Sequence, residues 1–286
     1  MRQAYLPIAV AGILAAFFII ERFCPLRGTR APLLLRLFIN VAMSGLAFLT
    51  AMIVVRPSAL GALAWASRES FGLIHLVPAQ AWARCLVGFV LLDLSFYYWH
   101  VINHKVPFLW RFHNVHHIDP DLDVSTGFRF HFGEVLMSTV FRVAQVSLTG
   151  VSFATFAAYE LVFQANTLFH HSNLRLPIHV ERLLNAVLVT PRMHGVHHSQ
   201  VRGETNSNFG VVFRWWDAWH RTLRLNIPQS EIDIGVAGYS RPDDNRLWHA
   251  LTLPFRAQRD YWRRDDGSIP DRDMSALERD PGRLAE

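Results

Sequence analysis

Ten of the fifteen histidines in this chain gather in four short motifs. They are His100 and His104 in WHVINH, His113, His116 and His117 in HNVHH, His170 and His171 in FHHSN, and His194, His197 and His198 in HGVHH. Residues three and four positions apart share one face of a helix, so each HxxHH motif predicts a face that carries three imidazoles. Crowded imidazoles resist protonation, and a bound metal ion takes the place of the missing protons.

The rest of the sequence narrows the kind of metal site. Only two cysteines occur, Cys24 and Cys85, so the metal ligands must be nitrogen or oxygen atoms. Imidazole suits zinc, copper, iron and nickel, but a structural zinc closes with four ligands. Eight or more histidines therefore predict two metal ions. A single HxxHH motif is equally compatible with histidines that line a polar face, whereas two of them beside an HxxxH favour the metal.

The composition predicts that the elements holding these histidines lie in a membrane. The 286 residues are 51% hydrophobic, and the mean hydropathy is +0.17. Apolar runs occupy residues 4–20, 37–55, 85–99, 135–149 and 151–169. We expect an all-α integral membrane protein with four or five apolar helices in a single domain, residues 1–286. The last two runs form a hairpin whose arms are short against the roughly 20 residues that a full span requires.

The distribution of charge predicts the orientation. The formal charge of +5 comes from 27 Arg and one Lys against 23 acids, and 16 of the arginines follow residue 170. Four arginines lie between the first two apolar runs, whereas residues 56–70 contain two. Cations favour the cytoplasmic side, so all four histidine motifs are expected there, with residues 170–286 as a water-facing helical cap. The cations form no basic tract interleaved with aromatics, which argues against a nucleic-acid partner.

The order of the motifs, HxxxH, HxxHH, a later histidine and HxxHH around a membrane hairpin, resembles the fatty acid hydroxylase and sterol desaturase superfamily. The similarity extends to LWRFHNVHH, DVSTGFRFHFGE, HSNLRLP, TPRMHGVHH and ETNSNFG followed by WD, and it spans roughly residues 93–223. The resemblance implies an integral-membrane enzyme with a histidine-rich di-iron centre. Such an enzyme uses O2 as a co-substrate to hydroxylate or desaturate a lipid.

The resemblance also implies the ligands of two iron ions. They are His100, His104, His113, His116, His117, His171, His194, His197 and His198. His170 is a further candidate ligand, although it stands one position before the histidine that matches the family phrase. His131 matches a frequent family histidine and is expected to line the site, but Phe132 follows it where the family commonly has proline.

Two polar residues are candidates for supporting the chemistry. Asp93 lies on one helical stripe with His100 and His104, and an acid inside an apolar run is a functional candidate. It could accept a hydrogen bond from a ligand imidazole, or it could form an ion pair with Arg84 or Arg142. Asn208, in ETNSNFG, could hydrogen-bond a ligand or a metal-bound water, or it could belong to a turn.

The predicted reaction is O2-dependent hydroxylation of a lipid or sterol C–H bond, with desaturation as the close variant. A zinc-dependent membrane hydrolase is an alternative, but no motif supplies the carboxylate of HExxH. A metal transporter or sensor is another, but its ligands would be distributed through the bilayer.

The reaction needs electrons, and the chain shows no nucleotide fingerprint, iron-sulfur cysteine set or haem segment. A separate donor is therefore expected, a ferredoxin or cytochrome with its reductase. The arginines of the cap could form its docking face, or they could follow from the positive-inside bias or bind lipid head groups. The Arg-rich, Lys-poor composition favours a bacterial inner membrane over an endoplasmic reticulum.

Overall fold

The computed structural model describes residues 5–272, and within this range the chain forms helices joined by loops with isolated β-bridges but no strand. The predicted all-α fold is confirmed. The apolar helices are α1 (Tyr5–Phe23), α2 (Leu33–Thr50), α3 (Arg56–Arg68), α4 (Ala81–Lys105), α6 (Phe132–Thr149) and α7 (Phe153–His171). The others are α5 (Pro107–His117), α8 (Ile178–Asn185), α9 (Pro191–His197), α10 (Arg202–Thr205), α11 (Trp215–His220) and α12 (Leu247–Thr252).

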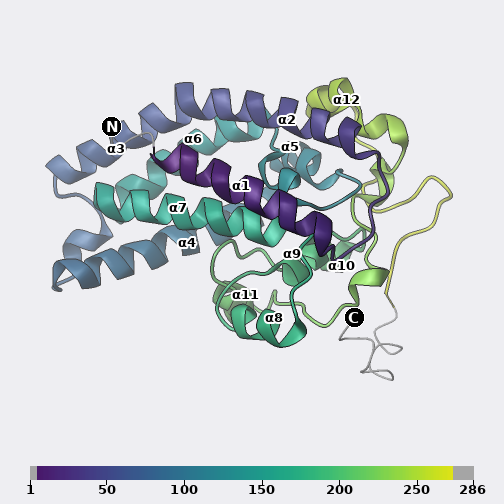
Figure 1. Ribbon diagram of the computed structural model, residues 1–286. Helices are drawn as coiled ribbons and strands as arrows, with labels where there is room; N and C mark the ends of the chain where they lie inside the picture. Colours follow the sequence, from purple (N-terminus) through teal and green to yellow (C-terminus); the bar gives the residue numbers. More distant parts are fainter. Residues whose placement is uncertain (1–4, 273–286) are drawn as a thin grey trace.

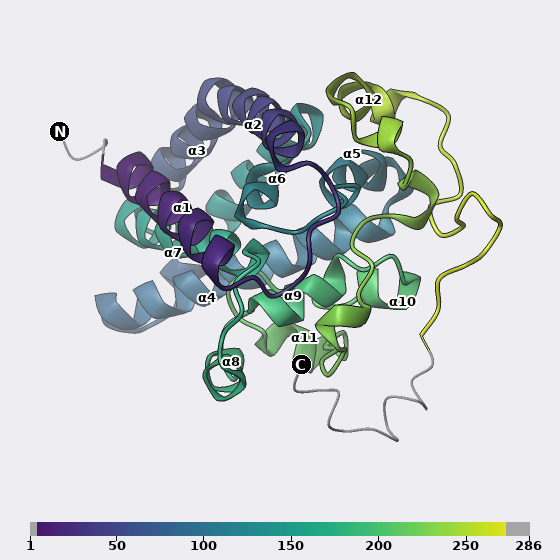
Figure 2. The same cartoon turned by 45° about the vertical axis from the view of Figure 1, so that its right-hand side comes forward.

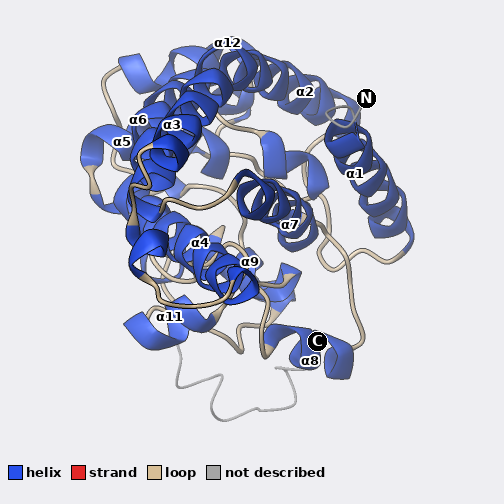
Figure 3. Ribbon diagram, turned by 90° about the vertical axis from the view of Figure 1, so that its left-hand side faces the viewer, coloured by secondary structure: helices blue, strands red, loops and turns tan. Residues whose placement is uncertain are grey.

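The apolar helices pack side by side as a bundle, and the shorter helices gather at one end of it (Figure 1). Helix α6 packs against α2, α3 and α4, while α7 packs against α1 and α4. The view along the bundle in Figure 3 shows the same neighbours around its axis. Two stretches of the described residues, Leu33–Leu76 and Ala81–Lys105, are long and apolar enough to cross a membrane. Exposed side chains such as Phe38, Val41 and Ile53 give the bundle an apolar outer surface.

Helices α2 and α3 form one rod, which corrects the prediction that the second apolar run ends at residue 55. Residues Ala51–Val55 form a π-helical turn that carries the rod on to Arg68. A proline inside a helix lacks an N–H donor and crowds the carbonyl four residues earlier, which for Pro57 belongs to Ile53. The wider π turn stands at this position, so it accommodates Pro57 without ending the helix.

Helices α6 and α7 form the predicted hairpin. Gly150 ends α6 in the left-handed conformation at φ 67°, which glycine adopts without a steric cost. Ser152 then caps α7 by accepting a hydrogen bond from the backbone N–H of Thr155. Arg142 on the first arm forms an ion pair with Glu160 on the second. The hairpin thereby returns the C-terminal end of α7, with its two histidines, to the end of the bundle where α4 finishes.

The loop between α1 and α2 lies at this same end of the bundle. The buried guanidinium of Arg36 pairs with Asp119 at 2.6 Å and with Asp123 at 2.8 Å, just after α5. The backbone N–H of Arg27 donates to Asn173 Oδ1 at 2.9 Å, just after α7. In Figure 2 the loop from α1 to α2, drawn in dark purple, passes α9 on its way to α2. The first loop and the histidine motifs therefore share one end of the molecule, as the charge pattern predicts, while the cytoplasmic assignment stays a prediction.

Candidate metal centre

Nine of the ten histidines in the four motifs converge in two buried or half-buried groups at the junction of α4, α5, α7 and α9. The first histidine group consists of His100, His104, His113, His117 and His197. The second histidine group consists of His116, His171, His194 and His198. In each group the candidate ligand nitrogens lie within 4.8 Å of one another. Two adjacent clusters of this size provide enough nitrogen donors for two metal ions.

Each HxxHH motif is divided between the two groups, which corrects the prediction that each motif forms one three-ligand face. On α5, His113 and His117 belong to the first histidine group and His116 to the second. Around α9 the division is reversed, because His197 belongs to the first group while His194 and His198 belong to the second. Positions i and i+4 differ by about 40° around a helix, whereas position i+3 falls about 60° to the other side. The i, i+4 pairs therefore stay together and the remaining histidine points to the neighbouring group.

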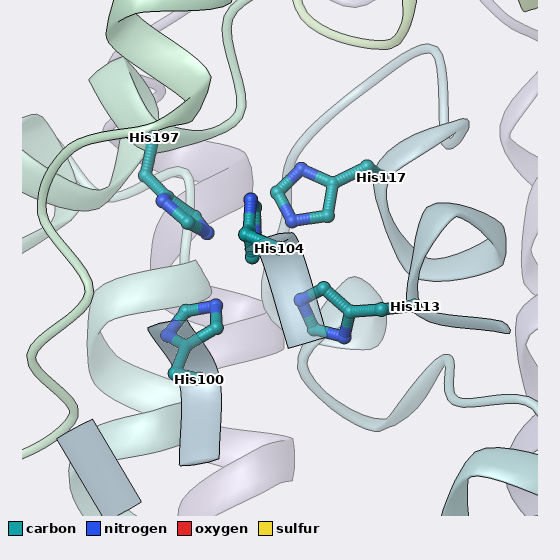
Figure 4. Close-up of side chains that lie close together, drawn as sticks. All are labelled: His100, His104, His113, His117 and His197. Carbon is teal, nitrogen blue, oxygen red and sulfur yellow. The ribbon is translucent and has the colours of Figure 1, made fainter. Parts of the chain in front are cut away.

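In the first histidine group, fixed acceptors hold the outer nitrogens of three rings. Nδ1 of His100 lies 2.9 Å from the carbonyl oxygen of Phe209, and Nδ1 of His197 lies 2.7 Å from that of Ser207. Nδ1 of His113 lies 2.8 Å from a carboxylate oxygen of the buried Glu134. An acceptor at Nδ1 keeps the proton there, so Nε2 presents its lone pair (Figure 4).

Several inner nitrogens of the first histidine group have no hydrogen-bond partner. They are Nε2 of His104, His113 and His197 and both ring nitrogens of His117. A buried polar atom without a partner costs about 1–3 kcal/mol, so such atoms are rare unless a ligand takes the place of the partner. The rings come from α4, α5 and α9 and surround a common space in Figure 4, and each offers one nitrogen as a candidate ligand atom. The arrangement fits a bound metal ion.

In the second histidine group, hydrogen bonds between the rings cannot satisfy all the Nε2 atoms. Nε2 of His171 lies 3.1 Å from Nε2 of His116 and 3.0 Å from Nε2 of His194, which lies 3.1 Å from Nε2 of His198. Nδ1 of His171 donates to the carbonyl oxygen of Thr167 at 2.8 Å, so its Nε2 carries a lone pair. Each nitrogen holds either one proton or one lone pair, and these three contacts cannot all be linear hydrogen bonds between neutral rings. A shared cation satisfies four lone pairs at once.

The charge state of the histidines suits metal binding. Burial and the neighbouring imidazoles lower the pKa of His116, His117, His194, His197 and His198 well below the usual histidine range. Neutral rings at physiological pH are the form that binds a metal, and no proton has to be displaced from them.

Two histidines that were predicted to bind a metal or line the site, His170 and His131, lie outside both groups. The ring of His170 packs against the second histidine group, with its centroid 4.1 Å from the ring centroid of His194. Its Nδ1 lies 3.4 Å from the amide nitrogen of Asn166. His131 does not line the groups, contrary to prediction. Its Nδ1 accepts the backbone N–H of Gly133 and so caps α6, and its Nε2 lies 3.1 Å from the carbonyl oxygen of Leu251. Both ring nitrogens of His131 are occupied, so its position is structural.

Asp93 and Asn208, the two polar candidates, also have partners that differ from the predicted ones. Asp93 touches neither a ligand imidazole nor an arginine. Its carboxylate accepts hydrogen bonds from Trp216 Nε1 at 2.8 Å, from the hydroxyl of Tyr159 at 3.2 Å, and from two backbone amides at residues 212 and 213. The side chain of Asn208, at φ 54°, bonds the backbone of Met193 and Arg224. Both residues tie the loop after α10 to its surroundings.

Glu134 is the functional residue that the sequence reasoning missed. It lies in the quoted phrase FRFHFGE, three positions after His131, and that phrase was the signal that could have identified it. Its carboxylate holds the His113 ring, which is one of the two roles predicted for Asp93. The backbone carbonyls that hold His100, His171 and His197 have no counterpart in any sequence motif, because every residue carries one.

The segment that carries both histidine groups is similar to a known protein family. The fatty acid hydroxylase family matches residues 85–222, the segment that contributes every member of both histidine groups. These residues form a fatty acid hydroxylase domain, which makes up just under half of the chain. The prediction made from the order of the motifs is confirmed. The matched segment includes the ends of α4 and α7 and the helices α5 and α9, which carry both histidine groups.

Curated relatives support this assignment. The chain is 31% identical to an ornithine lipid hydroxylase of Rhizobium tropici over 57% of its own length and 49% of the relative. It is 30% identical to the cholesterol 25-hydroxylase of Mus musculus over 53% and 50% of the two chains, and 27% identical to the alkylglycerol monooxygenase of Danio rerio over 68% and 42%. The chain thus spans half or less of the length of these fatty acid hydroxylase relatives. No solved structure gives a significant match.

Proposed function

We propose that this membrane protein catalyses O2-dependent hydroxylation of a lipid or sterol C–H bond at a di-iron centre held by the two histidine groups. The observation that carries the proposal is the convergence of nine imidazoles in two adjacent groups at one end of an apolar bundle. Relatives named as hydroxylases and monooxygenases of lipids support the reaction class. Desaturation of the same kind of substrate is the close variant, and a cytoplasmic site in a bacterial inner membrane is the proposed location.

The number of imidazoles supports iron over a structural zinc. A structural zinc site closes with four protein ligands, whereas the first histidine group alone contains five histidines. Nine imidazoles in two groups suit two ions with more than four coordination positions, which leave room for O2 or water beside the histidines.

The residues of the chain have separate tasks in this proposal. Bound iron would supply the activation of O2 and the removal of hydrogen from an unactivated C–H bond, which no amino-acid side chain can do. Glu134 and the backbone carbonyls of residues 167, 207 and 209 hold the ring protons on the outer nitrogens and so keep the inner nitrogens available. Burial of His117 and His198 keeps bulk water away from the centre.

The reaction also needs two electrons from outside the chain, and we propose a ferredoxin or cytochrome with its reductase as the donor. The Arg-rich cap supports docking of an acidic protein. Purified enzyme with O2 and lipid alone is expected to be inactive, and the donor system is expected to restore turnover less effectively as salt increases.

Metal analysis joined to an isotope experiment tests the proposed function. We expect about two iron ions per chain, and oxygen from 18O2 in the lipid product when the donor system is present. His197→Ala is expected to lower iron content and abolish turnover, whereas His249→Ala, outside both groups, is the matched control and is expected to do neither. One zinc ion per chain with activity that survives removal of iron would overturn the proposal.

A further inference from the structure

A cavity of about 510 Å³ reaches the first histidine group from the water-facing end of the molecule. His104 forms part of its wall, and the rest comes from the C-terminal end of α4, the start of α5, α10 and residues 261–262. Lys105 and Arg202 stand at its exposed margin, while Trp110 is buried. The cavity therefore extends from solvent, past the cations of Lys105 and Arg202, to the candidate metal ligand His104.

Besides the candidate ligand His104, three side chains of this cavity offer hydrogen-bond donors. The indole N–H of Trp110 has no hydrogen-bond partner, and the residue is 5% exposed. Lys105 gives one of its three protons to Asn206 Oδ1 at 3.1 Å and keeps two. Arg202 lies over the ring of Trp262 at 5.7 Å. Across residues 5–272, neither Lys105 nor Arg202 forms an ion pair.

The cavity contains no group that would repel an anion. None of its nine lining residues carries a carboxylate. A buried indole N–H without an acceptor is destabilising, so an oxygen acceptor is expected in the cavity. Two cations beside it favour an acceptor with negative charge, and the stacked rings of Trp110 and Trp262, 6.0 Å apart, offer a face for the carbon atoms attached to it.

We infer that this cavity binds the anionic oxyacid headgroup, a carboxylate or phosphate, of the lipid substrate. The inference rests on the proposed function, because it assigns a substrate class to the same centre. Lys105 and Arg202 contribute the charge, and Trp110 contributes a directed hydrogen bond. Because His104 belongs to both the cavity wall and the first histidine group, the oxidised carbon lies near the headgroup end of the lipid rather than at the far end of an acyl chain.

Equilibrium dialysis on the metal-loaded full chain in detergent tests the assignment without turnover. The probes are dihexanoyl phosphatidic acid and dihexanoylglycerol, which share their acyl chains and differ in the phosphate. We expect Lys105→Gln and Arg202→Gln each to weaken binding of the phosphatidic acid about fivefold, the upper value for an exposed charge pair. Trp110→Phe, which keeps an aromatic ring in place, should also weaken it. Binding of dihexanoylglycerol should stay unchanged in all variants.

Arg246→Gln is the matched control, because the Arg246 side chain is 73% exposed and lies outside the cavity. Unchanged affinity for the phosphatidic acid in both cation variants would overturn the inference. Inorganic phosphate that binds as tightly as the lipid would assign the cavity to a free anion instead. Variants that keep lipid affinity but are reduced more slowly by the donor protein would make it a docking surface, and this outcome also overturns the inference. Intact headgroup binding in a protein without oxygenase activity would reject only the proposed function.

Discussion

The carboxylate of Glu134 is expected to control the metal affinity of the first histidine group. Its Oε1 lies 2.8 Å from Nδ1 of His113, and the residue is 5% exposed. A charged acceptor at this distance fixes the ring orientation and makes the opposite nitrogen more basic. Loss of such a partner typically lowers metal affinity about 10- to 100-fold, or about 1.4–2.7 kcal/mol. We therefore expect Glu134→Ala to weaken one iron site by this factor, and Glu134→Gln, which keeps an acceptor oxygen without the charge, to weaken it less.

Competition with a chelator of known iron affinity measures this effect, with iron content followed as chelator is added. Wild-type protein and Glu134→Gln should lose the first iron at higher chelator concentrations than Glu134→Ala. Glu160→Gln is the control, because Glu160 also forms a partly buried ion pair, with Arg142, but contacts no histidine. If Glu134→Ala retained wild-type iron affinity while Glu160→Gln did the same, the carboxylate would have no part in holding the metal and the reasoning would be refuted.

The remaining predictions separate ligands from structural residues. His117→Ala and His198→Ala each remove a ligand from a different group, so each should lower iron content from about two to about one per chain by metal analysis; loss of no iron in either would contradict the division into two groups. His131→Ala removes a helix cap and should lower the free energy of unfolding by about 1 kcal/mol in denaturant titrations with iron content unchanged; lower iron content would return His131 to the site. Asp93→Asn replaces an acceptor of four hydrogen bonds and should lower the free energy of unfolding by about 1–3 kcal/mol with iron affinity unchanged. Reduced iron affinity at normal stability would instead show that Asp93 orients a metal ligand.

The helices and the metal-binding chemistry were predictable because both are local properties of the sequence. Each apolar run lies in helical structure, apart from residues 151 and 152, which precede α7, and residue 4, which is outside the described residues. The histidine spacings predicted clusters, and the clusters are present. The rod through α2 and α3 was missed because Pro57 beside Arg56 resembles a helix end, and sequence alone does not reveal that a π turn accommodates the proline.

The site assignments that the observed contacts do not support concern residues whose hydrogen-bond partners come from distant segments. Asp93 shares a helical stripe with His100, yet its carboxylate meets the indole of Trp216, a residue more than a hundred positions later. His131 and Asn208 carry the right chemical groups for a metal site, but backbone atoms from distant segments occupy those groups. Glu134 is the converse case, because only the packing of α6 against α5 reveals the imidazole that it holds.

The division of both HxxHH motifs makes the relative position of α5 and α9 decisive for both histidine groups. Each of these helices contributes to both groups, so a shift of one helix disturbs both centres at once. Buried charges hold the segments next to these two helices. The Arg36 guanidinium pairs with Asp119 and Asp123 immediately after α5.

After α9, the Asp217 carboxylate accepts the backbone amides of residues 209 and 210 at 2.8 Å, in the loop whose carbonyls hold His100 and His197. A pair of neighbouring metal centres requires this precision, because a displacement of about 1 Å at the reacting atoms is enough to lower a catalytic rate substantially. Polar residues outside the histidine groups are therefore expected to support the site, because they hold the segments that position its histidines.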